Sequence, residues 1–584
     1  MKRIKNRHLF NGDSCFLFAY SKIWQPEGGK FSVKTIHRFL DKLADAGIDT
    51  LLMNPNTDVA WYPSKVWPTS IDGYSRGDRD FFRSDGLADA LGVDSNSLID
   101  DAILMYDGAY DLRESGIDWL AEVCSGCRQR GIAPWLSVRM NDTHRAANPD
   151  DWSNSPFQGR ADAKQKNTFI FPHQNALGLP VGLNYGLPDV RSHMLTLIRE
   201  LIEDYDFEGM ELDWLRDPIC CEPPATETDI AELTEWHSEI RELVRKKEKR
   251  IGKPYALGIR CPANIDLIRN IGLDVIGMAR SGVIDFVSPS NYMQTSWNIC
   301  YSSLKRRLGP DITVYGVIEY LFNWLPVYSP ELELSDSRTN PDRVELLRGN
   351  AAGKLAAGAD GIEYFNFFEA DTLSNGLSNY SHIKDIDNLD ALRGQEKLYG
   401  LGYMFGSWVR PLFETVDHFP ANLEPGALKS VRLPMCAEPP ESDLEVTVQV
   451  IVEKRDRPDM IGVSLNGSWP QWESEEIDDL LFSAGSQDKY APEKHLLTKH
   501  SPKHTAYNFR FETQNILEGW NELVILNGNL DRCHGGNASN NYSAMVMFAP
   551  YDADRDYSEE ERAEHSVVVA GVEVGIRKTK RGHT

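Results

Sequence analysis

A pair of carboxylates gives the clearest chemical signal in this sequence. Glu211 and Asp213 lie two residues apart in an otherwise largely apolar segment, EGMELDW at 208–214. Side chains alternate between the two faces of a β-strand, so on a strand both carboxylates would point to the same side. Carboxylates are costly to bury unless another group pairs with them or uses them. The segment therefore predicts either an acidic functional site or a structural ion pair with a nearby arginine.

Glu319 is a second acidic candidate, in the apolar segment TVYGVIEYL at 313–321. Alternation places it on the same face as Tyr315 and Val317. Hydrolysis of a glycosidic bond needs two carboxyl groups, one ionised to attack or to activate water and the other protonated to assist the leaving group. Asp213 and Glu319 together would meet this requirement. The alternative for Glu319 is an exposed residue at the end of a strand.

Polar residues follow the ends of nearly all the other apolar segments. Arg139 and Arg260 are expected to point inward, where either could keep Glu211 ionised or contact a negatively charged substrate. Two such arginines in an acidic protein suggest an anionic glycan, and the competing interpretation is that both serve Glu211 and Asp213. The remaining candidates for substrate binding are Asn54, Trp61, Asn141, Asp142, His144, Asn291, Tyr292, Trp324 and Glu363.

Aromatic residues gather in the connections that follow these segments. An indole or phenol face can pack against the face of a sugar ring, and it tolerates a wet cleft. The alternative is that several of these rings only pack the loops onto the strands beneath them. The residues concerned are Trp61, Tyr62, Trp67, Tyr74, Trp297 and Trp324.

The elements that must hold these side chains alternate between strand and helix patterns up to about residue 370. Between the apolar runs lie helical patterns such as 189–205, whose apolar residues form one stripe. Eight strands alternating with helices predict a closed parallel barrel, the (β/α)8 or TIM-barrel fold, over residues 1–405. Long connections at 56–110 and 142–188 leave the face at which barrel active sites form. The expected strands are 14–20, 49–55, 133–141, 208–214, 255–262, 285–293, 313–321 and 360–368.

A different pattern begins after about residue 405. Helical periodicity fades, and strict alternation takes over in segments such as DLEVTVQVIVE at 443–453. An Asn-Gly turn signal at 466–467 closes one such segment. Residues 415–584 are therefore expected to form an all-β accessory domain, a β-sandwich.

Composition restricts the partners of the protein. The 584 residues are 41% hydrophobic and carry a net charge of −25, which argues against nucleic acid and against an anionic membrane surface. No run of about 18 apolar residues is present. The apolar stretch near the N-terminus is too short for a signal peptide, so a cytoplasmic location is expected if this is the natural start, and a periplasmic or secreted one if a leader was removed. The sequence does not indicate an oligomeric state.

Neither a metal nor another cofactor is expected. His144 and His173 lack the spacing of an HExxH motif, and the CxxC formed by Cys124 and Cys127 has no second pair to complete a zinc site. The nine cysteines are odd in number and scattered, and we expect them to be reduced thiols.

The segment GMELDW, after a helix that begins NYGLPDVR, resembles uncharacterised bacterial proteins described as glycoside hydrolase family 10-like. It is also similar to the wider set of (β/α)8 glycosidases with an acidic fourth strand. Family 10 xylanases carry Asn-Glu where this chain has Leu212-Asp213, and family 18 chitinases carry their catalytic Glu where this chain has Leu215. α-Galactosidase-like and fucosidase-like barrels use an Asp at the end of this strand as nucleophile.

The resemblance implies a hydrolase of oligo- or polysaccharides that retains anomeric configuration. Asp213 would be the nucleophile and Glu319 the acid/base, with Glu211 in support. Two other classes stay open. One is a non-catalytic carbohydrate-binding protein, and the other is a polysaccharide lyase in which Arg139 and Arg260 would neutralise a uronate.

Overall fold

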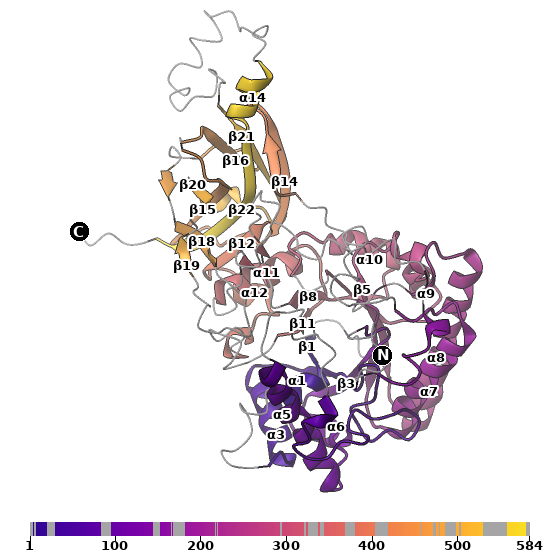
Figure 1. The fold of residues 1–584 in the computed structure, drawn as a ribbon. Helices are drawn as coiled ribbons and strands as arrows, with labels where there is room; N and C mark the ends of the chain where they lie inside the picture. The colour runs from indigo at the N-terminus through magenta and orange to yellow at the C-terminus, as the bar shows by residue number, and fades with distance from the viewer. Residues whose placement is uncertain are drawn as a thin grey trace, which may run out of the picture.

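A computed structural model describes most of the chain, in two parts that are joined by a shared helix. Figure 1 shows helices and parallel strands in the N-terminal part and antiparallel strands in the C-terminal part. The described residues are 4, 7–19, 30–82, 95–143, 152, 154–164, 166, 182–215, 218, 220–291, 295–319, 323–324, 337–338, 344–367, 380–402, 418–456, 458–470, 475–477, 479–484, 498–500, 504–529 and 558–579.

Parallel strands form a closed ring in the N-terminal part. Their order is β7-β6-β5-β4-β3-β2-β1-β11-β8, and the ring closes where β7 and β8 meet as two halves of one strand position. Tyr315 lies between these halves: its N–H donates to the Val287 carbonyl on β6 (3.0 Å), and the Gly316 N–H donates to the Gly361 carbonyl (2.9 Å) on the other side. The predicted (β/α)8 barrel is confirmed. Its strands are β1 (His8–Gly12), β2 (Thr50–Met53), β3 (Ala133–Arg139), β4 (Gly209–Asp213), β5 (Ala256–Pro262), β6 (Phe286–Ser290), β7 (Thr313–Val314), β8 (Gly316–Glu319) and β11 (Ile362–Phe365).

The first strand was expected at 14–20, and this expectation is wrong. Residues Ser14–Ala19 form the helix α1, and the strand is the preceding segment His8–Gly12. A short apolar run such as CFLFA suits a buried helical turn as well as a buried strand, and alternation alone cannot separate the two. The correction has a consequence for the site, because it brings Asn11 of β1 into the barrel.

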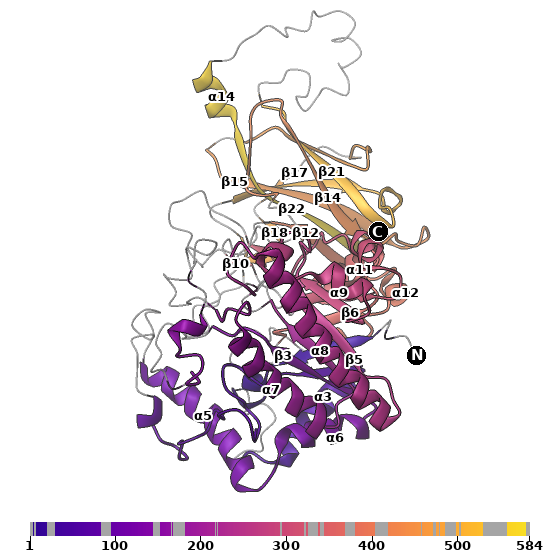
Figure 2. The ribbon, with the colours of Figure 1, turned by 90° about the vertical axis from the view of Figure 1, so that its right-hand side faces the viewer.

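Helices cover the outside of the ring. Figure 2 shows α7 and α8 running alongside the strands, and the helical pattern expected at 189–205 coincides with α7. The ends of α8 follow from its sequence, because Thr226 and Asp229 cap the N-terminus reciprocally and Gly252 takes a left-handed conformation (φ 68°) at the C-terminus. The helices are α3 (Val33–Asp45), α5 (Ser95–Glu114), α6 (Trp119–Gln129), α7 (Pro188–Asp204), α8 (Glu227–Ile251), α9 (Val275–Arg280), α10 (Tyr301–Leu308) and α11 (Val344–Ala356). Short 3-10 helices lie at Asp80–Phe82, Ala161–Ala163, Ile268–Ile271 and Tyr380–Ile383.

The interior of the barrel is filled in layers. The layer nearest the N-terminal ends of the strands is apolar, and within it Trp135 and Phe286 stack with ring centroids 5.2 Å apart. Glycines make room for these rings: a Cβ on Gly209 would lie 2.7 Å from the Trp135 ring, and one on Gly258 would lie 2.4 Å from the Phe286 ring. The barrel is therefore plugged below, and polar side chains occupy the levels above. The apolar layer comprises Leu9, Leu52, Trp135, Ala256, Phe286 and Tyr315.

The C-terminal part consists of antiparallel sheets. A larger sheet has the order β12-β22-β15-β20-β17, with β13 also paired to β22, and a smaller sheet has the order β14-β21-β16. Alternate residues of both sheets are buried in one core, which is the pattern of the predicted β-sandwich. The strands are β12 (Lys397–Leu401), β13 (Ala421–Leu423), β14 (Leu428–Met435), β15 (Leu444–Glu453), β16 (Ile461–Leu465), β17 (Glu475–Ile477), β20 (His504–Phe511), β21 (Gly519–Asn527) and β22 (Val567–Lys578).

Smaller elements complete the described chain. Two-stranded pairs are formed by β9 (Asn323–Trp324) with β10 (Ser337–Arg338) and by β18 (Asp479–Ala484) with β19 (Thr498–His500). Short helices are α12 (Leu389–Leu392), α14 (Glu559–His565) and the 3-10 turn Thr513–Asn515. The expected division of the chain at 405–415 stays a prediction, although β12, which pairs with β22, lies before it.

Helix α11 packs between the barrel and the sandwich. Its two glycines contact backbone of the C-terminal part so closely that no side chain would fit. A Cβ on Gly349 would lie 2.0 Å from the Leu398 carbonyl oxygen, and one on Gly353 would lie 2.5 Å from that of Pro434. On another side the same helix covers β8, where the Lys354 side chain lies against Gly316. The last barrel helix is thus shared by both parts.

Two further properties concern the described residues only. None of the described helices is long and apolar enough to cross a membrane. The described cysteines with placed side chains are all free thiols, namely Cys124, Cys127, Cys220, Cys221, Cys261, Cys300 and Cys436.

Candidate active site

The level above the apolar plug is a buried polar layer. Asn11 on β1 is at its centre, where its amide Nδ2 donates to Glu211 Oε1 (2.9 Å), Ser137 Oγ (3.0 Å) and Glu363 Oε1 (3.3 Å). Ser137 donates to Glu211 Oε1 (3.0 Å), and Ser288 donates to Glu363 Oε2 (2.5 Å). Strands β1, β3, β4, β6 and β11 therefore each send one polar residue into this layer.

Burial makes the two carboxyl groups of this layer hard to ionise. Burial raises the pKa of Glu211 well above its usual value, and the nearby charges of Glu363 and Asp213 raise it further. Burial also raises the pKa of Glu363, against the lowering influence of Arg260 and of the Ser288 and Asn11 hydrogen bonds. Glu211 Oε2 has no hydrogen-bond partner among the described residues. Burial in this layer thus shifts both carboxyl groups towards their protonated forms.

Arg260 bridges two carboxylates one level higher, at the C-terminal ends of the strands. Its Nη1 contacts both carboxylate oxygens of Asp213, at 3.1 and 3.2 Å, and its Nη2 donates to Glu319 Oε1 at 2.7 Å. Arg260 and Asp213 are each 1% exposed, and Glu319 is fully buried. The Phe365 ring lies under the guanidinium, 3.4 Å from its carbon to the ring centroid.

The shared arginine sets how far apart the two acids lie. Nη1 and Nη2 belong to one rigid, planar group, so the contacting oxygens of Asp213 and Glu319 lie within about 8 Å of each other. Burial lowers the pKa of Arg260, but the surrounding carboxylates of Asp213, Glu319, Glu363 and Glu211 raise it by more, and the guanidinium is charged. A buried positive charge therefore lies directly between the carboxyl groups of Asp213 and Glu319.

Arg139, the second predicted arginine, is also paired. It donates to Asp142 Oδ2 at 2.9 Å through Nη1 and to Asp13 through Nη2. In the strand register it lies beside Asp213, because β3 and β4 pair there. Neither Arg139 nor Arg260 contacts Glu211 directly by a hydrogen bond or ion pair that the structure records, and each is instead held by two other carboxylates.

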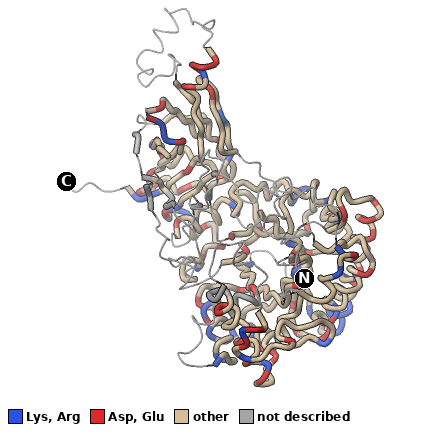
Figure 3. The backbone as a smooth tube through the Cα atoms, in the orientation of Figure 1, with Lys and Arg blue, Asp and Glu red and all other residues tan. Residues whose placement is uncertain are grey.

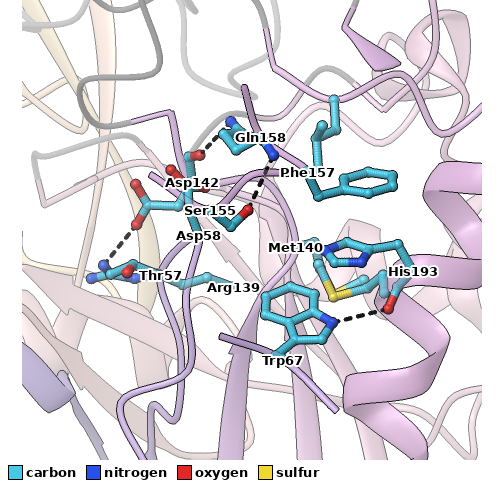
Figure 4. Close-up of a pocket in the computed structure, with 12 residues that line it drawn as sticks. Thr57, Asp58, Trp67, Arg139, Met140, Asp142, Ser155, Phe157, Gln158 and His193 are labelled. Carbon is cyan, nitrogen blue, oxygen red and sulfur yellow. Dashed lines mark hydrogen bonds and ion pairs between the residues drawn. The ribbon is translucent and has the colours of Figure 1, made fainter. Parts of the chain in front are cut away.

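A pocket lies next to Arg139, where the connections after β2 and β3 meet α7 (Figure 4). One wall is a stack in which His193 lies between Trp67 (centroids 4.4 Å apart) and Phe157 (3.8 Å). Burial, followed by the charge of Arg160, lowers the pKa of His193 to about 4, so this ring is neutral near pH 7. The opposite wall is polar and includes Arg139, Asp142 and Gln158.

Two of the other predicted polar residues bind nearby main-chain groups. Asn54 Nδ2 donates to the Ser137 carbonyl (2.8 Å), and Asn141 Oδ1 accepts from the Leu183 N–H (2.9 Å). Asn291 is buried directly after β6. His144 and Tyr292 lie outside the described residues, and the side chain of Trp324 does as well.

The aromatic residues of the connection after β2 are buried. Trp61 packs on Phe18 (centroids 6.0 Å) and Tyr106 (5.3 Å), and Tyr62 donates to Glu200 Oε2 (2.7 Å). Tyr74 belongs to the same core. These rings therefore pack the loop onto the barrel, which was the alternative to sugar binding considered from the sequence.

Sequence reasoning missed three residues of the site. Asn11 and Asp13 were missed because the first strand was placed too late in the chain, although Asn-Gly-Asp directly after the apolar HLF is a polar strand end like the others. Thr295, which binds the main chain of Glu319, lies in a connection without any recognisable pattern.

Comparisons with known proteins find remote structural likeness alone. The sequence matches no protein-family model and no curated protein. Among solved structures it is similar to α-L-fucosidase isoenzyme 2 from Paenibacillus thiaminolyticus (11% identity, TM-score 0.36), covering 66% of this chain and 49%, about half, of that one. It is also similar to an α-amylase from Geobacillus thermoleovorans, with 14% identity and a TM-score of 0.34, covering 88% of this chain and 100% of that one. A third similar structure is a glycoside hydrolase family 18 N-acetylglucosaminidase from Paenibacillus barengoltzii, with 12% identity and a TM-score of 0.32, covering 65% of this chain and 98% of that one. Likeness of this degree does not assign an activity, and the following proposal uses the site alone.

Proposed function

We propose that this protein is a glycoside hydrolase that acts on an oligo- or polysaccharide. The observation that carries the proposal is the pair Asp213 and Glu319, held by one arginine at the C-terminal ends of the barrel strands. This is the face at which barrel enzymes build their active sites. Glycosidases use two carboxyl groups about 5–9.5 Å apart, and the upper bound of about 8 Å derived from Arg260 is compatible with that range.

Asp213 is the proposed nucleophile. Arg260 Nη1 donates to its carboxylate, and the Leu215 N–H fixes one oxygen by donating to Oδ1 at 3.0 Å. In the proposed retaining reaction, an Asp213 oxygen bonds to the anomeric carbon while the bond to the leaving oxygen breaks. Water then displaces Asp213, and the anomeric configuration of the substrate is kept.

Glu319 is the proposed acid/base, and its contact with Arg260 imposes a condition. A general acid must carry a proton when the leaving oxygen departs, whereas the arginine favours the charged form of Glu319. We therefore propose that a bound sugar separates Glu319 from Arg260, which stays on Asp213. The carboxyl groups with raised pKa, Glu211 and Glu363, lie one level below and are the alternative proton donors.

The proposed substrate is an uncharged glycan. Both arginines expected to bind an anion are already paired with carboxylates of the protein. The net charge of −25 repels anionic chains at long range, and Figure 3 shows acidic residues along both parts of the molecule. Faster turnover of a uronate-containing glycan than of its neutral analogue would contradict this part of the proposal.

The experiment is turnover of a panel of neutral 4-nitrophenyl and phenyl glycosides by wild type, Asp213→Asn and Glu319→Gln. Asp213→Asn should lose nearly all activity on every substrate. Glu319→Gln should lose activity mainly on phenyl glycosides, because 4-nitrophenolate leaves without a proton. Proton NMR of the first product anomer should show retention.

Four outcomes point elsewhere. Near-wild-type activity of Asp213→Asn would exclude it as nucleophile, and an unchanged Glu319→Gln on phenyl glycosides would transfer the acid role to Glu363 or Glu211. An unsaturated product absorbing in the ultraviolet would indicate a lyase. Binding of glycans without turnover of any of them would favour the non-catalytic carbohydrate-binding protein. The near-complete burial of Asp213, Arg260 and Glu319 favours this second candidate, because a buried carboxylate cannot reach a sugar.

A further inference from the structure

Glu319 is held in the barrel by a side chain where a strand would normally hold it. On one side its strand β8 pairs with β11. On the other side the ring is interrupted, because β6 pairs with β7 and this ladder ends at Val314. In a parallel ladder the N–H and C=O of one residue bond to the same neighbouring strand, so the break leaves both groups of Glu319 without a strand partner on this side.

The hydroxyl of Thr295 takes the place of that strand. Thr295 Oγ1 accepts from the Glu319 N–H at 2.8 Å and donates to the Glu319 carbonyl at 2.5 Å. Two main-chain groups that would be costly to bury unpaired are thereby satisfied by one side chain. Both bonds are to the residue whose carboxylate contacts Arg260, so the position of that carboxylate depends on Thr295.

Thr295 is in turn fixed from helix α11 through its neighbour Ser296. Lys354 Nζ donates to the Ser296 carbonyl, and it lies 3.3 Å from Ser296 Oγ. Asn350, one turn earlier on the helix, donates to the same carbonyl at 3.1 Å. Ser296 is therefore held by two side chains of one helix, directly beside the residue that holds Glu319.

Lys354 is an unusual residue to find in this place. It is 1% exposed, and among the residues that the structure describes it forms no ion pair. Burial lowers its pKa to about 7, so the amine can stay partly uncharged and needs no carboxylate beside it. A buried amine needs hydrogen-bond acceptors, and the recorded acceptors of Lys354 are both on Ser296.

We propose that Thr295 is a positioning residue for Glu319, and that Lys354 holds Thr295 in place by binding Ser296. The proposal rests on the proposed function of Glu319 as acid/base. Neither residue touches the substrate in this scheme. Their role is to keep the Glu319 main chain fixed while its carboxyl group moves between Arg260 and the leaving oxygen.

The test compares Thr295→Val with Thr295→Ser. Valine keeps the shape of threonine and removes the hydroxyl, whereas serine keeps the hydroxyl. Thr295→Val should lower kcat on phenyl glycosides by about tenfold to a hundredfold with little change in KM, because displacement of a catalytic group by about 1 Å can cost that much. Thr295→Ser should stay near wild type, as should the matched control Thr313→Val, a buried threonine on β7 for which no bond to Glu319 is recorded.

A second measurement does not depend on turnover. Hydrogen exchange of the Glu319 amide should be faster in Thr295→Val than in Thr295→Ser or Thr313→Val, because its acceptor is gone. Lys354→Met, which acts one step further away, should change kcat and exchange in the same direction by less, and it serves if Thr295→Val does not fold.

The outcomes separate the two proposals. Equal exchange and equal kcat in Thr295→Val and Thr295→Ser, with activity lost in Glu319→Gln, would overturn the positioning role and leave Glu319 as acid/base. Unchanged activity in Glu319→Gln would overturn the proposed function, and in that case faster exchange in Thr295→Val would still support Thr295 as the group that fixes this main chain.

Discussion

Replacing Arg260 by Met is the most direct test of the electrostatics of the site. The change removes the arginine that pairs with both Asp213 and Glu319, and it keeps an apolar chain of similar length over Phe365. Two buried carboxylates then lose the cation that bridges them. The protein must either keep two buried charges or take up protons, and both options lower the free energy of unfolding at neutral pH.

The magnitude follows from the burial of the three groups. Removing one partner from a buried ion pair costs about 3–5 kcal/mol, because the other charge stays behind uncompensated. Asp213 and Glu319 are at most 1% exposed and share one arginine, so we expect Arg260→Met to lose at least about 3 kcal/mol at pH 7. The loss should shrink as the pH falls towards 4, since protonation removes the buried negative charges.

The assay is urea unfolding of wild type and variant at several pH values. Arg269→Met is the matched control in the same barrel: Arg269 also contacts a carboxylate twice, Glu227 at 2.8 and 2.6 Å, but its side chain is 40% exposed. Exposed pairs contribute about 1 kcal/mol or less, so the control should stay close to wild type.

Two results would refute this reasoning. One is a loss of unfolding free energy for Arg260→Met that is no larger than the loss for Arg269→Met. It would mean that water reaches Asp213 and Glu319 and screens their charges. The other is a loss that grows as the pH falls, which has the wrong sign for two carboxylates left without their cation.

Three further predictions concern titration and charge. Glu211→Gln should become more stable relative to wild type as the pH rises from 4.5, by up to about 1.4 kcal/mol per pH unit. The reason is that the raised pKa keeps Glu211 protonated in the folded protein while the unfolded chain ionises. Urea unfolding from pH 4 to 8 checks this, and a stability difference that does not change with pH would contradict it. Lys354→Met should gain stability relative to wild type as the pH falls from 10.5 to about 7, at about 1.4 kcal/mol per pH unit. The reason is that over this pH range the Lys354 amine binds a proton in the unfolded wild type but not in the folded one. A stability difference that does not change with pH would show that Lys354 is charged in the folded protein. Asn11→Ala should cost about 1–3 kcal/mol in unfolding free energy, since it leaves buried oxygens of Glu211, Ser137 and Glu363 without their shared donor. A loss no larger than that of the exposed control Asn422→Ala would contradict the central place given to Asn11.

Much of the barrel could be predicted because its strands repeat one pattern. Apolar runs followed by polar residues marked seven of the eight strand positions, and alternation placed Glu211, Asp213 and Glu319 inside the ring. The first position failed for a physical reason: CFLFA is apolar on all sides, and a buried helix and a buried strand both require that.

The pairing inside the barrel could not be predicted in the same way. That Arg260 lies beside Asp213 follows from adjacent strands, but its contact with Glu319 depends on how the ring closes through Tyr315. The hold of Thr295 on Glu319 depends on the same closure. Such contacts join residues far apart in the chain, and no local pattern of residue types encodes the break in the ladder that produces them.

The two glycines of α11 give this architecture a mark that can be recognised in other chains. They are four residues apart, as one face of a helix requires, and each meets a carbonyl oxygen of the C-terminal part where even a methyl group would collide. A homologue that keeps the sandwich in this place should therefore keep Gly-x-x-x-Gly in its last barrel helix, with a lysine directly after it if Glu319 is held in the same way. A homologue that has lost the sandwich is free to place larger residues there. The Gly-x-x-x-Gly spacing is therefore the sequence feature to look for in barrels that carry a sandwich against their last helix.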